Sequence, residues 1–152
     1  MSSVQHLASI GIDDDWATPG STLRSGLALI DDMIFLDVCA TEKNRQFKDY
    51  FSKETDALKQ EWTKNFFMNP PYSEVSTWMQ YASHQVQKNK VVGLILTFAK
   101  TDTTWWHEFV EGKCKVYFVK GRIKFWKNGA PGKNSAPYPS CWIIMRPTKG
   151  PE

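Results

Sequence analysis

The sequence predicts an α/β domain built on a mainly parallel sheet. Short apolar runs alternate with amphipathic segments, and the last third of the chain contains strand-like segments with no helix between them. The run from Val91 to Phe98 is continuously apolar, which is typical of a parallel strand covered on both faces. These observations favour a sheet flanked by helices and closed by a C-terminal antiparallel hairpin.

The first half of the chain carries a helix, a strand and two shorter elements. Thr18 and Pro19 resemble the cap and first turn of a helix whose apolar face is formed by Leu23, Leu27 and Ile30. Residues 34–38 form an apolar run that predicts a buried strand. A short helix over residues 44–51 and a turn over residues 56–62 are expected to follow.

The second half begins with a strand over residues 65–68, which delivers Asn69 at its carboxyl end. Ser73 can cap the next helix, whose apolar residues recur at helical spacing: Val75, Trp78, Met79, Ala82 and Val86. Asp102 or Thr103 then begins a helix that contains Trp105 and Trp106, two rings expected in the core, and Gly112 ends it.

The C-terminal third is expected to contain strands over residues 115–119, 122–126 and 140–146. Residues 127–139 form a loop rich in Gly and Pro, which is too long and too polar to be a simple turn. In a parallel sheet, ligands bind where the strands end. Both Asp37, late in its strand, and Asn69 fall on that edge.

The composition indicates one soluble domain spanning residues 1–152. Hydrophobic residues make up 41% and charged residues 23% of the chain, and no apolar run approaches the roughly 20 residues of a membrane span. The first residues show no secretory signal, so a cytoplasmic location is expected. The three cysteines are widely separated, which argues against a disulfide framework and against a metal site.

The tetrapeptide Asn69-Pro70-Pro71-Tyr72 is the most informative motif. The Asn69 amide oxygen and the Pro70 carbonyl can each accept one N–H bond from a planar amine, while the Tyr72 ring stacks on a base. An amine held in this way can attack a methyl sulfonium. The two prolines fix φ and donate no hydrogen bonds, so the acceptors stay available. An ordinary Pro-rich turn after a strand is the structural alternative.

The charge distribution favours a polyanionic partner. The net charge is only +3, but lysine and arginine gather in residues 113–133. Within this segment Arg122 and Lys124 flank an apolar side chain after Gly121, and Lys127 follows shortly. We expect these three cations to contact the phosphates or bases of such a partner, although a solvated hairpin rim would have the same composition.

Several motifs occur together in the order typical of one family. The chain resembles the small phage-type, Dam-like DNA N6-adenine methyltransferases, and the resemblance lies in these residues: Asp14-Asp15-Trp16-Ala17-Thr18-Pro19, Phe35-Leu36-Asp37-Val38-Cys39-Ala40, Asn44, Asp56-Ala57-Leu58, Trp62, Asn69-Pro70-Pro71-Tyr72-Ser73, Asp102-Thr103-Thr104-Trp105-Trp106-His107 and Gly121-Arg122-Ile123-Lys124-Phe125.

The resemblance implies a compact, trimmed Rossmann-like sheet that binds S-adenosyl-L-methionine and transfers its methyl group to the N6 amine of a flipped adenine in DNA. Asn69, Pro70, Pro71 and Tyr72 would be catalytic. The residues implied in cofactor binding are Thr18, Pro19, Asp37, Ala40, Asn44 and Asp56, with Glu42 as a second candidate for the ribose. The implied setting is DNA methylation or restriction–modification in the cytoplasm of a bacterial host, by a monomer or weak homodimer.

Two alternatives stay open from the sequence. The same fold can methylate another planar amine, such as cytosine N4 or a glutamine side chain. The Gly-rich turn that usually follows the first strand is here Asp37-Val38-Cys39-Ala40-Thr41, without Gly, so Ala40 would have to be the close-approach residue. A nucleic-acid-binding module with a decayed cofactor pocket would also fit this turn.

Overall fold

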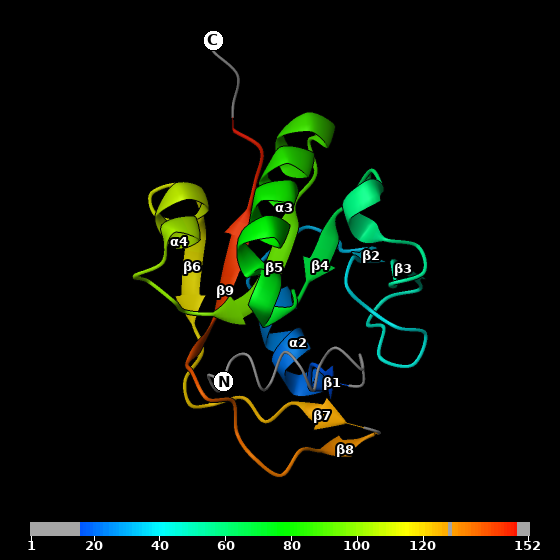
Figure 1. Cartoon of the computed structure of the whole chain (residues 1–152), viewed down its shortest axis with the longest axis vertical. Helices are drawn as coiled ribbons and strands as arrows, with labels where there is room; N and C mark the ends of the chain where they lie inside the picture. Colours follow the sequence, from blue (N-terminus) through cyan, green and yellow to red (C-terminus); the bar gives the residue numbers. More distant parts are fainter. Residues whose placement is uncertain (1–15, 128, 149–152) are drawn as a thin grey trace.

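A computed structural model describes residues 16–127 and 129–148, which form a mixed α/β domain (Figure 1). The main sheet has the strand order β3-β2-β4-β5-β9-β6. Its strands are β2 (Leu36–Asp37), β3 (Asp49–Tyr50), β4 (Phe66–Met68), β5 (Gly93–Phe98), β6 (Lys115–Phe118) and β9 (Ser140–Met145).

The predicted α/β class is confirmed, and the six-stranded sheet is mixed. Strands β3, β2, β4 and β5 pair in parallel, whereas β9 lies antiparallel between β5 and β6. The carboxyl ends of β4 and β5 therefore point the same way, toward the lower end of the molecule in Figure 1. This is the edge at which the sequence places Asp37 and Asn69.

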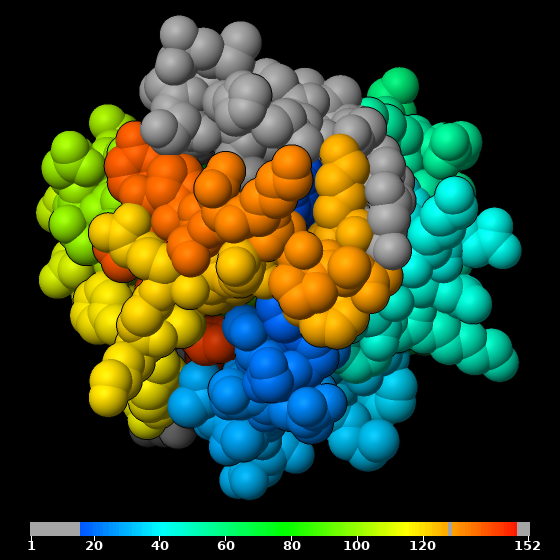
Figure 2. Space-filling model, turned by 90° about the horizontal axis from the view of Figure 1, so that it is seen from below, coloured from blue at the N-terminus to red at the C-terminus, as the bar shows by residue number. Residues whose placement is uncertain are grey.

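A smaller sheet lies below that edge. It has the order β1-β7-β8 and consists of β1 (Trp16–Ala17), β7 (Trp126–Lys127) and β8 (Ala130–Pro131). Strand β7 pairs antiparallel with both neighbours, so the segment before the first helix is joined to the hairpin that precedes β9. Figure 2, seen from below, shows residues 120–140 and the blue segment that contains α2 spread over this end of the molecule.

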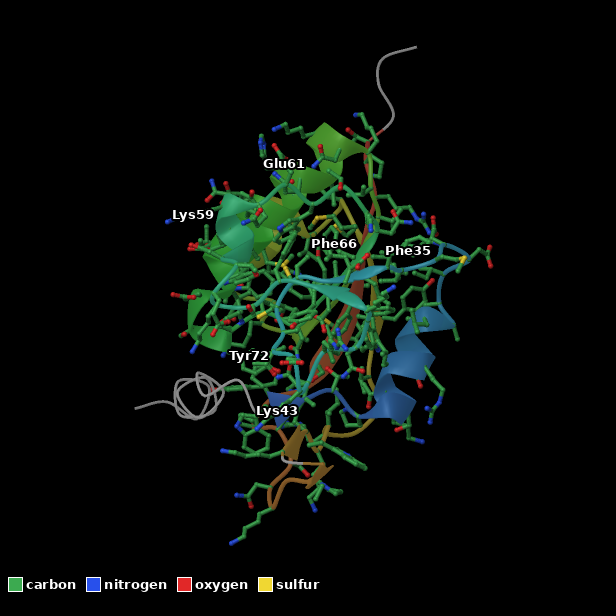
Figure 3. The ribbon with its side chains drawn as sticks, turned by 90° about the vertical axis from the view of Figure 1, so that its right-hand side faces the viewer. Phe35, Lys43, Lys59, Glu61, Phe66 and Tyr72 are labelled. Carbon is green, nitrogen blue, oxygen red and sulfur yellow. The ribbon has the colours of Figure 1, made fainter. Side chains whose placement is uncertain are left out.

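Helices cover both faces of the main sheet. Figure 3 shows α3 on one side of the strands and α2 on the other. The helical segments are α2 (Gly20–Leu27), α3 (Val75–Asn89) and α4 (Thr104–Phe109), with short 3₁₀ turns η1 (Ala57–Lys59) and η2 (Tyr72–Glu74). None of the helices in the described ranges has both the length and the apolar character needed to cross a membrane.

The hydrophobic core consists of two layers because side chains alternate along the buried strands. In β5, Ile95 joins the layer that contains α3 and α4, and Leu94 and Leu96 join the opposite layer. The α3-side layer also contains Trp105 and Trp106, which are 8% and 3% exposed, so their predicted place in the core is confirmed. The carboxyl ends of β4 and β5 therefore lie at one end of a core that is packed on both faces of the main sheet.

Two predicted elements were wrong. Residues 44–51 form turns and strand β3 in place of a helix, because side chains hold this backbone locally: the Gln46 N–H donates to the Asp37 carboxylate, and the Asn44 N–H donates to the Thr41 hydroxyl. Of residues 122–126, only Trp126 lies in a strand. The preceding carbonyls pair instead with the loop, since Ile123 accepts from the Ala136 N–H.

Helix α2 contacts the sheet at Gly26, and this contact gives a stability prediction. A Cβ added at Gly26 would lie 2.5 Å from the Trp142 ring, so Gly26→Ala forces the helix away from β9. We expect Gly26→Ala to lower the free energy of unfolding by about 1–3 kcal/mol, as overpacked cores do. The measurement is the urea midpoint.

Gly20→Ala in the same helix is the matched control. Its nearest neighbour would be the flexible end of Arg24, at 3.3 Å, so the free energy of unfolding should not fall. Equal urea midpoints for Gly26→Ala and the unsubstituted protein would show that the helix can shift without a loss of stability.

Candidate active site

A cleft opens where β2 and β4 end, between the main sheet and the β1-β7-β8 sheet. Three parts of the chain and one ring from the segment before β7 line it: Trp16, Ala17 and Thr18; Asp37, Cys39, Ala40, Asn44 and Gln46; Phe67, Asn69, Pro70, Pro71 and Tyr72; and Phe125. Most of the residues predicted for catalysis and cofactor binding therefore share one cavity.

Asn69 is the first residue after β4, and its amide is held from two sides. Its Nδ2 donates to the Thr18 hydroxyl at 3.4 Å, and its Oδ1 accepts from the Tyr72 hydroxyl at 3.4 Å. An amide oxygen has two acceptor positions, so Oδ1 keeps one for a ligand amine. The Pro70 carbonyl accepts no hydrogen bond from the described backbone. The motif thus presents two acceptors in the cleft.

Tyr72 is held as a platform with one face already covered. Its ring stacks on Phe98 with centroids 4.0 Å apart and planes 8° apart, and Phe125 meets it edge-on at 6.5 Å. Burial raises the pKa of the Tyr72 hydroxyl above its ordinary range, so the group stays protonated and donates to Asn69. The opposite ring face is the one that a planar ligand can use.

Asp37 ends β2 and is a buried carboxylate, only 2% exposed. Its Oδ1 accepts from the Cys39 N–H at 3.2 Å, and its Oδ2 accepts from the Gln46 N–H at 3.0 Å. Burial raises the pKa of Asp37 to about 7, although both backbone hydrogen bonds act in the opposite direction. No lysine or arginine of the described residues pairs with it, so its charge is balanced only by backbone dipoles.

The turn after β2 is fixed to β1 by side-chain hydrogen bonds. The Asn44 Oδ1 accepts from the Thr41 N–H at 2.6 Å, and its Nδ2 donates to the Trp16 carbonyl at 3.2 Å. Gln46 donates from Nε2 to the Thr18 carbonyl at 3.1 Å. Asn44 therefore closes this corner of the cleft, and Ala40 lies buried in its wall.

Three of the residues predicted to bind the cofactor do not line the cleft: Pro19, Asp56 and the second ribose candidate, Glu42, which is exposed. Pro19 lies one residue beyond Thr18, and its carbonyl accepts from Leu23 at the start of α2. Asp56 precedes η1 in a left-handed conformation, and its carboxylate lies 3.7 Å from the Lys59 amine. The structure does not bring Asp56 to Asp37 and Asn69.

Sequence reasoning did not single out Gln46, Trp16 or Phe125 as cleft residues. Gln46 was predicted to lie in a helix. The two aromatic residues, Trp16 and Phe125, are 109 positions apart in the sequence. Only the pairing of β1 with β7 brings these segments together. Two signals were available for the rings: the high aromatic content, and the presence of Trp16 and Phe125 in the motifs of the family resemblance.

The three predicted DNA contacts lie on or next to the β7–β8 hairpin. Arg122 donates from its guanidinium to the Pro137 carbonyl at 2.6 Å, so it braces the loop. The Lys127 amine lies over the Trp16 ring, 5.4 Å from its centroid. Lys124 is exposed and makes no ion pair with any described residue. Lys124 is therefore the cation best placed to meet a phosphate.

The fold and cleft define a small α/β protein that presents an amine-acceptor motif beside a buried carboxylate. The model of the DNA N-6-adenine-methyltransferase (Dam) family matches residues 8–152, and the chain belongs to this family. It is 28% identical over 117 residues to the DNA N-6-adenine-methyltransferase of Escherichia phage T1, covering 74% of this chain and 47% of the relative. It is 31% identical over 119 residues to that of Haemophilus phage HP1, covering 76% and 68%. The chain thus spans about half the length of the phage T1 relative and about two thirds of the length of the phage HP1 relative.

Proposed function

We propose that this protein transfers the methyl group of S-adenosyl-L-methionine to the N6 amine of adenine in DNA. Its family membership and the names of the two phage relatives support the proposal. The observation that carries it is one cleft in which the two acceptors of Asn69 and Pro70 lie with the isolated carboxylate of Asp37. We infer that the sheet is a trimmed Rossmann-like methyltransferase sheet, and that the protein acts in the bacterial host cytoplasm as a monomer or weak homodimer.

The donor set of the cleft fits the cofactor. A buried carboxylate without a cationic partner is costly, and an ammonium group such as that of the methionine end would balance it. Asp37 would hold this ammonium, and Thr18 would face the same end of the cofactor. When bound, the cofactor supplies an electrophilic methyl group on a sulfonium. Ala40 lines the cleft with only a methyl side chain, so the backbone there would allow close approach of the ligand.

The residues of the chain orient the other reactant. Tyr72 would stack on the free face of a flipped adenine, and this stacking offsets part of the few kcal/mol that flipping costs. Asn69 Oδ1 and the Pro70 carbonyl would then accept the two amine hydrogens. These acceptors would draw the nitrogen lone pair out of conjugation and face the positive charge that develops during attack. The methylated amine would then release one proton to water. Pro71 keeps the segment extended, so the geometry exists before the base arrives.

The direct test is methyl transfer to unmethylated plasmid DNA with labelled S-adenosyl-L-methionine, followed by base-resolution mapping. We expect label in N6-methyladenine. Label in N4-methylcytosine, or in protein glutamine, would instead support a different amine substrate for the same cleft. Calorimetry with the cofactor separates the enzyme from a binding module: a protein that binds DNA but gives no heat and no thermal shift with the cofactor would contradict the proposal.

Lys124 provides a prediction on DNA affinity. Lys124→Gln removes one exposed charge beside the cleft, so DNA binding should weaken and the slope of log affinity against log salt should fall by about one. The measurement is fluorescence anisotropy of a labelled duplex at several salt concentrations.

Lys90→Gln is the matched control for Lys124→Gln. Lys90 is also exposed but follows α3, at the opposite end of the molecule from the cleft. Its salt slope should stay that of the unsubstituted protein. If Lys124→Gln also had the salt slope of the unsubstituted protein, DNA would not contact this side of the hairpin.

A further inference from the structure

A second hollow adjoins the cleft, and its walls are partly the same. Ala17, Thr18 and Asn44 line both spaces, and the second is completed by Gly20, Lys43, Trp126 and Gly129. We propose that this hollow binds the nucleotide next to the target adenine in the DNA strand, with the Trp126 indole stacked on its base and the Lys43 amine on its phosphate. This inference rests on the proposed function, because the neighbouring cleft must hold the target base.

Trp126 presents an aromatic surface that the fold does not use. Its side chain is 39% exposed, whereas the ring of its neighbour Phe125 is 4% exposed and belongs to the core. In the small sheet, Trp126 lies opposite Ala17 on one side and Pro131 on the other. Residues opposite one another share a face of a sheet, so the indole stands on the same face as Ala17. That face borders the hollow.

The other face of β1 and β7 borders the cleft. Trp16 lies opposite Lys127, and Trp16 is a cleft residue. The two short strands β1 and β7 thus send one tryptophan to the cleft and the other to the hollow. The cleft that would hold the target adenine on Tyr72 and the hollow that contains Trp126 share Ala17, Thr18 and Asn44, so they suit two successive bases of a strand. Stacking on tryptophan accepts any base.

Lys43 supplies the charge that a nucleotide requires. Its side chain is exposed, and among the described residues it makes neither an ion pair nor a hydrogen bond. In Figure 3 its label lies between that of Tyr72 and the β7–β8 hairpin. Among residues 16–127 and 129–148, no acidic side chain lines the hollow. The lysine and the indole that these residues contribute match a phosphate and a base.

The test measures binding and needs no turnover. The probe is a labelled duplex of G·C pairs with a single adenine, placed opposite an abasic residue so that the adenine leaves the stack easily. In two further probes, an abasic residue replaces the base on the 5′ or the 3′ side of the adenine. Dissociation constants are measured with S-adenosylhomocysteine present, for the unsubstituted protein, Trp126→Ala, Trp126→Phe and Lys43→Gln.

We expect one of the two abasic neighbours to weaken binding of the unsubstituted protein by about tenfold, the usual value of one stacked base. Trp126→Ala should weaken binding of the intact probe by a similar factor and lose nothing further on that abasic probe. Trp126→Phe should retain most of the affinity. Lys43→Gln should lower the salt slope by about one on every probe, because each keeps the phosphate.

Phe118→Ala is the matched control, since Phe118 is 67% exposed on the edge strand β6. Its dissociation constants should not change. Unchanged binding by Trp126→Ala, or a loss that simply adds to the loss from the abasic neighbour, would overturn the inference. Transfer of a methyl group to the same duplex is measured separately. Failure of that transfer would contradict the proposed function, and the binding measurements could still be interpreted because they need no turnover.

Discussion

Asn69→Ala is expected to abolish methyl transfer while DNA affinity stays within a few fold of the unsubstituted value. In the proposed function the side chain provides one of two acceptors for the amine, and hydrogen bonds to Thr18 and Tyr72 orient it. Removing one aligned polar group from an active site typically costs about 10²–10³ in turnover. Because Asn69 does not lie among the exposed cations, phosphate binding should not change.

Single-turnover methyl transfer and anisotropy on the same DNA measure the two effects separately. Asn134→Ala is a suitable control, because Asn134 is exposed in the loop after β8. Its transfer rate should equal that of the unsubstituted protein. A normal transfer rate in Asn69→Ala would remove Asn69 from the catalytic role, and an equal loss in rate and DNA affinity would assign it to binding.

Asp37→Ala is expected to weaken cofactor binding by at least about thirtyfold, because truncating one partner of a buried charge pair costs about 2–5 kcal/mol. The same carboxyl makes binding depend on pH. The pKa of Asp37 is about 7 in the ligand-free protein, so below pH 7 the group is mostly neutral and must release a proton to hold an ammonium. Affinity should therefore rise between pH 5.5 and pH 7 and level off above it. It should fall again above about pH 8, where an α-amine loses its own proton.

The contribution of Asp37 to the stability of the ligand-free protein should show the opposite trend. The folded pKa of Asp37 lies above the value of about 3.9 expected in the unfolded chain, so the folded state binds more protons at this group between these values. The contribution of Asp37 to the free energy of unfolding therefore declines as pH rises from about 4 to about 7.

Calorimetry and thermal melts across this range measure both trends, and Asp37→Asn is the reference because it cannot titrate. Its cofactor affinity should lack the rise toward pH 7, and its melting temperature should lack the Asp37 part of the decline. Identical pH profiles for Asp37→Asn and the unsubstituted protein would assign the titration to another group.

The position of the Asn69–Tyr72 motif could be predicted because its signals are local in sequence. These residues are consecutive, and the apolar run before them marks a strand end, so their place at the edge of the sheet followed from residue types. Their catalytic role stays a prediction. Asp37 followed in the same way from the end of its own strand. Residues over 115–119 and 140–146 also formed the expected strands, with small changes at the ends.

The remaining parts of the site depend on contacts between distant segments. The bond between Thr18 and Asn69 spans 51 positions, and Phe125 reaches Tyr72 only because a loop folds back under the sheet. No periodicity encodes such contacts. The predicted helix over 44–51 failed for the converse reason: Asn44 and Asp37 provide hydrogen bonds that compete with helix formation, and their effect depends on where β2 ends.

The separation of the two sheets has a consequence for how the protein can diversify. Strands β7 and β8 make their ladder hydrogen bonds with β1 and with each other, and within the described residues none with the six-stranded sheet. The hairpin can therefore exchange residues, or lengthen, without breaking a ladder that supports Asp37 or Asn69. Under the proposed function, residues of the hairpin that contact DNA can change during evolution while the residues proposed to hold the methyl donor stay the same.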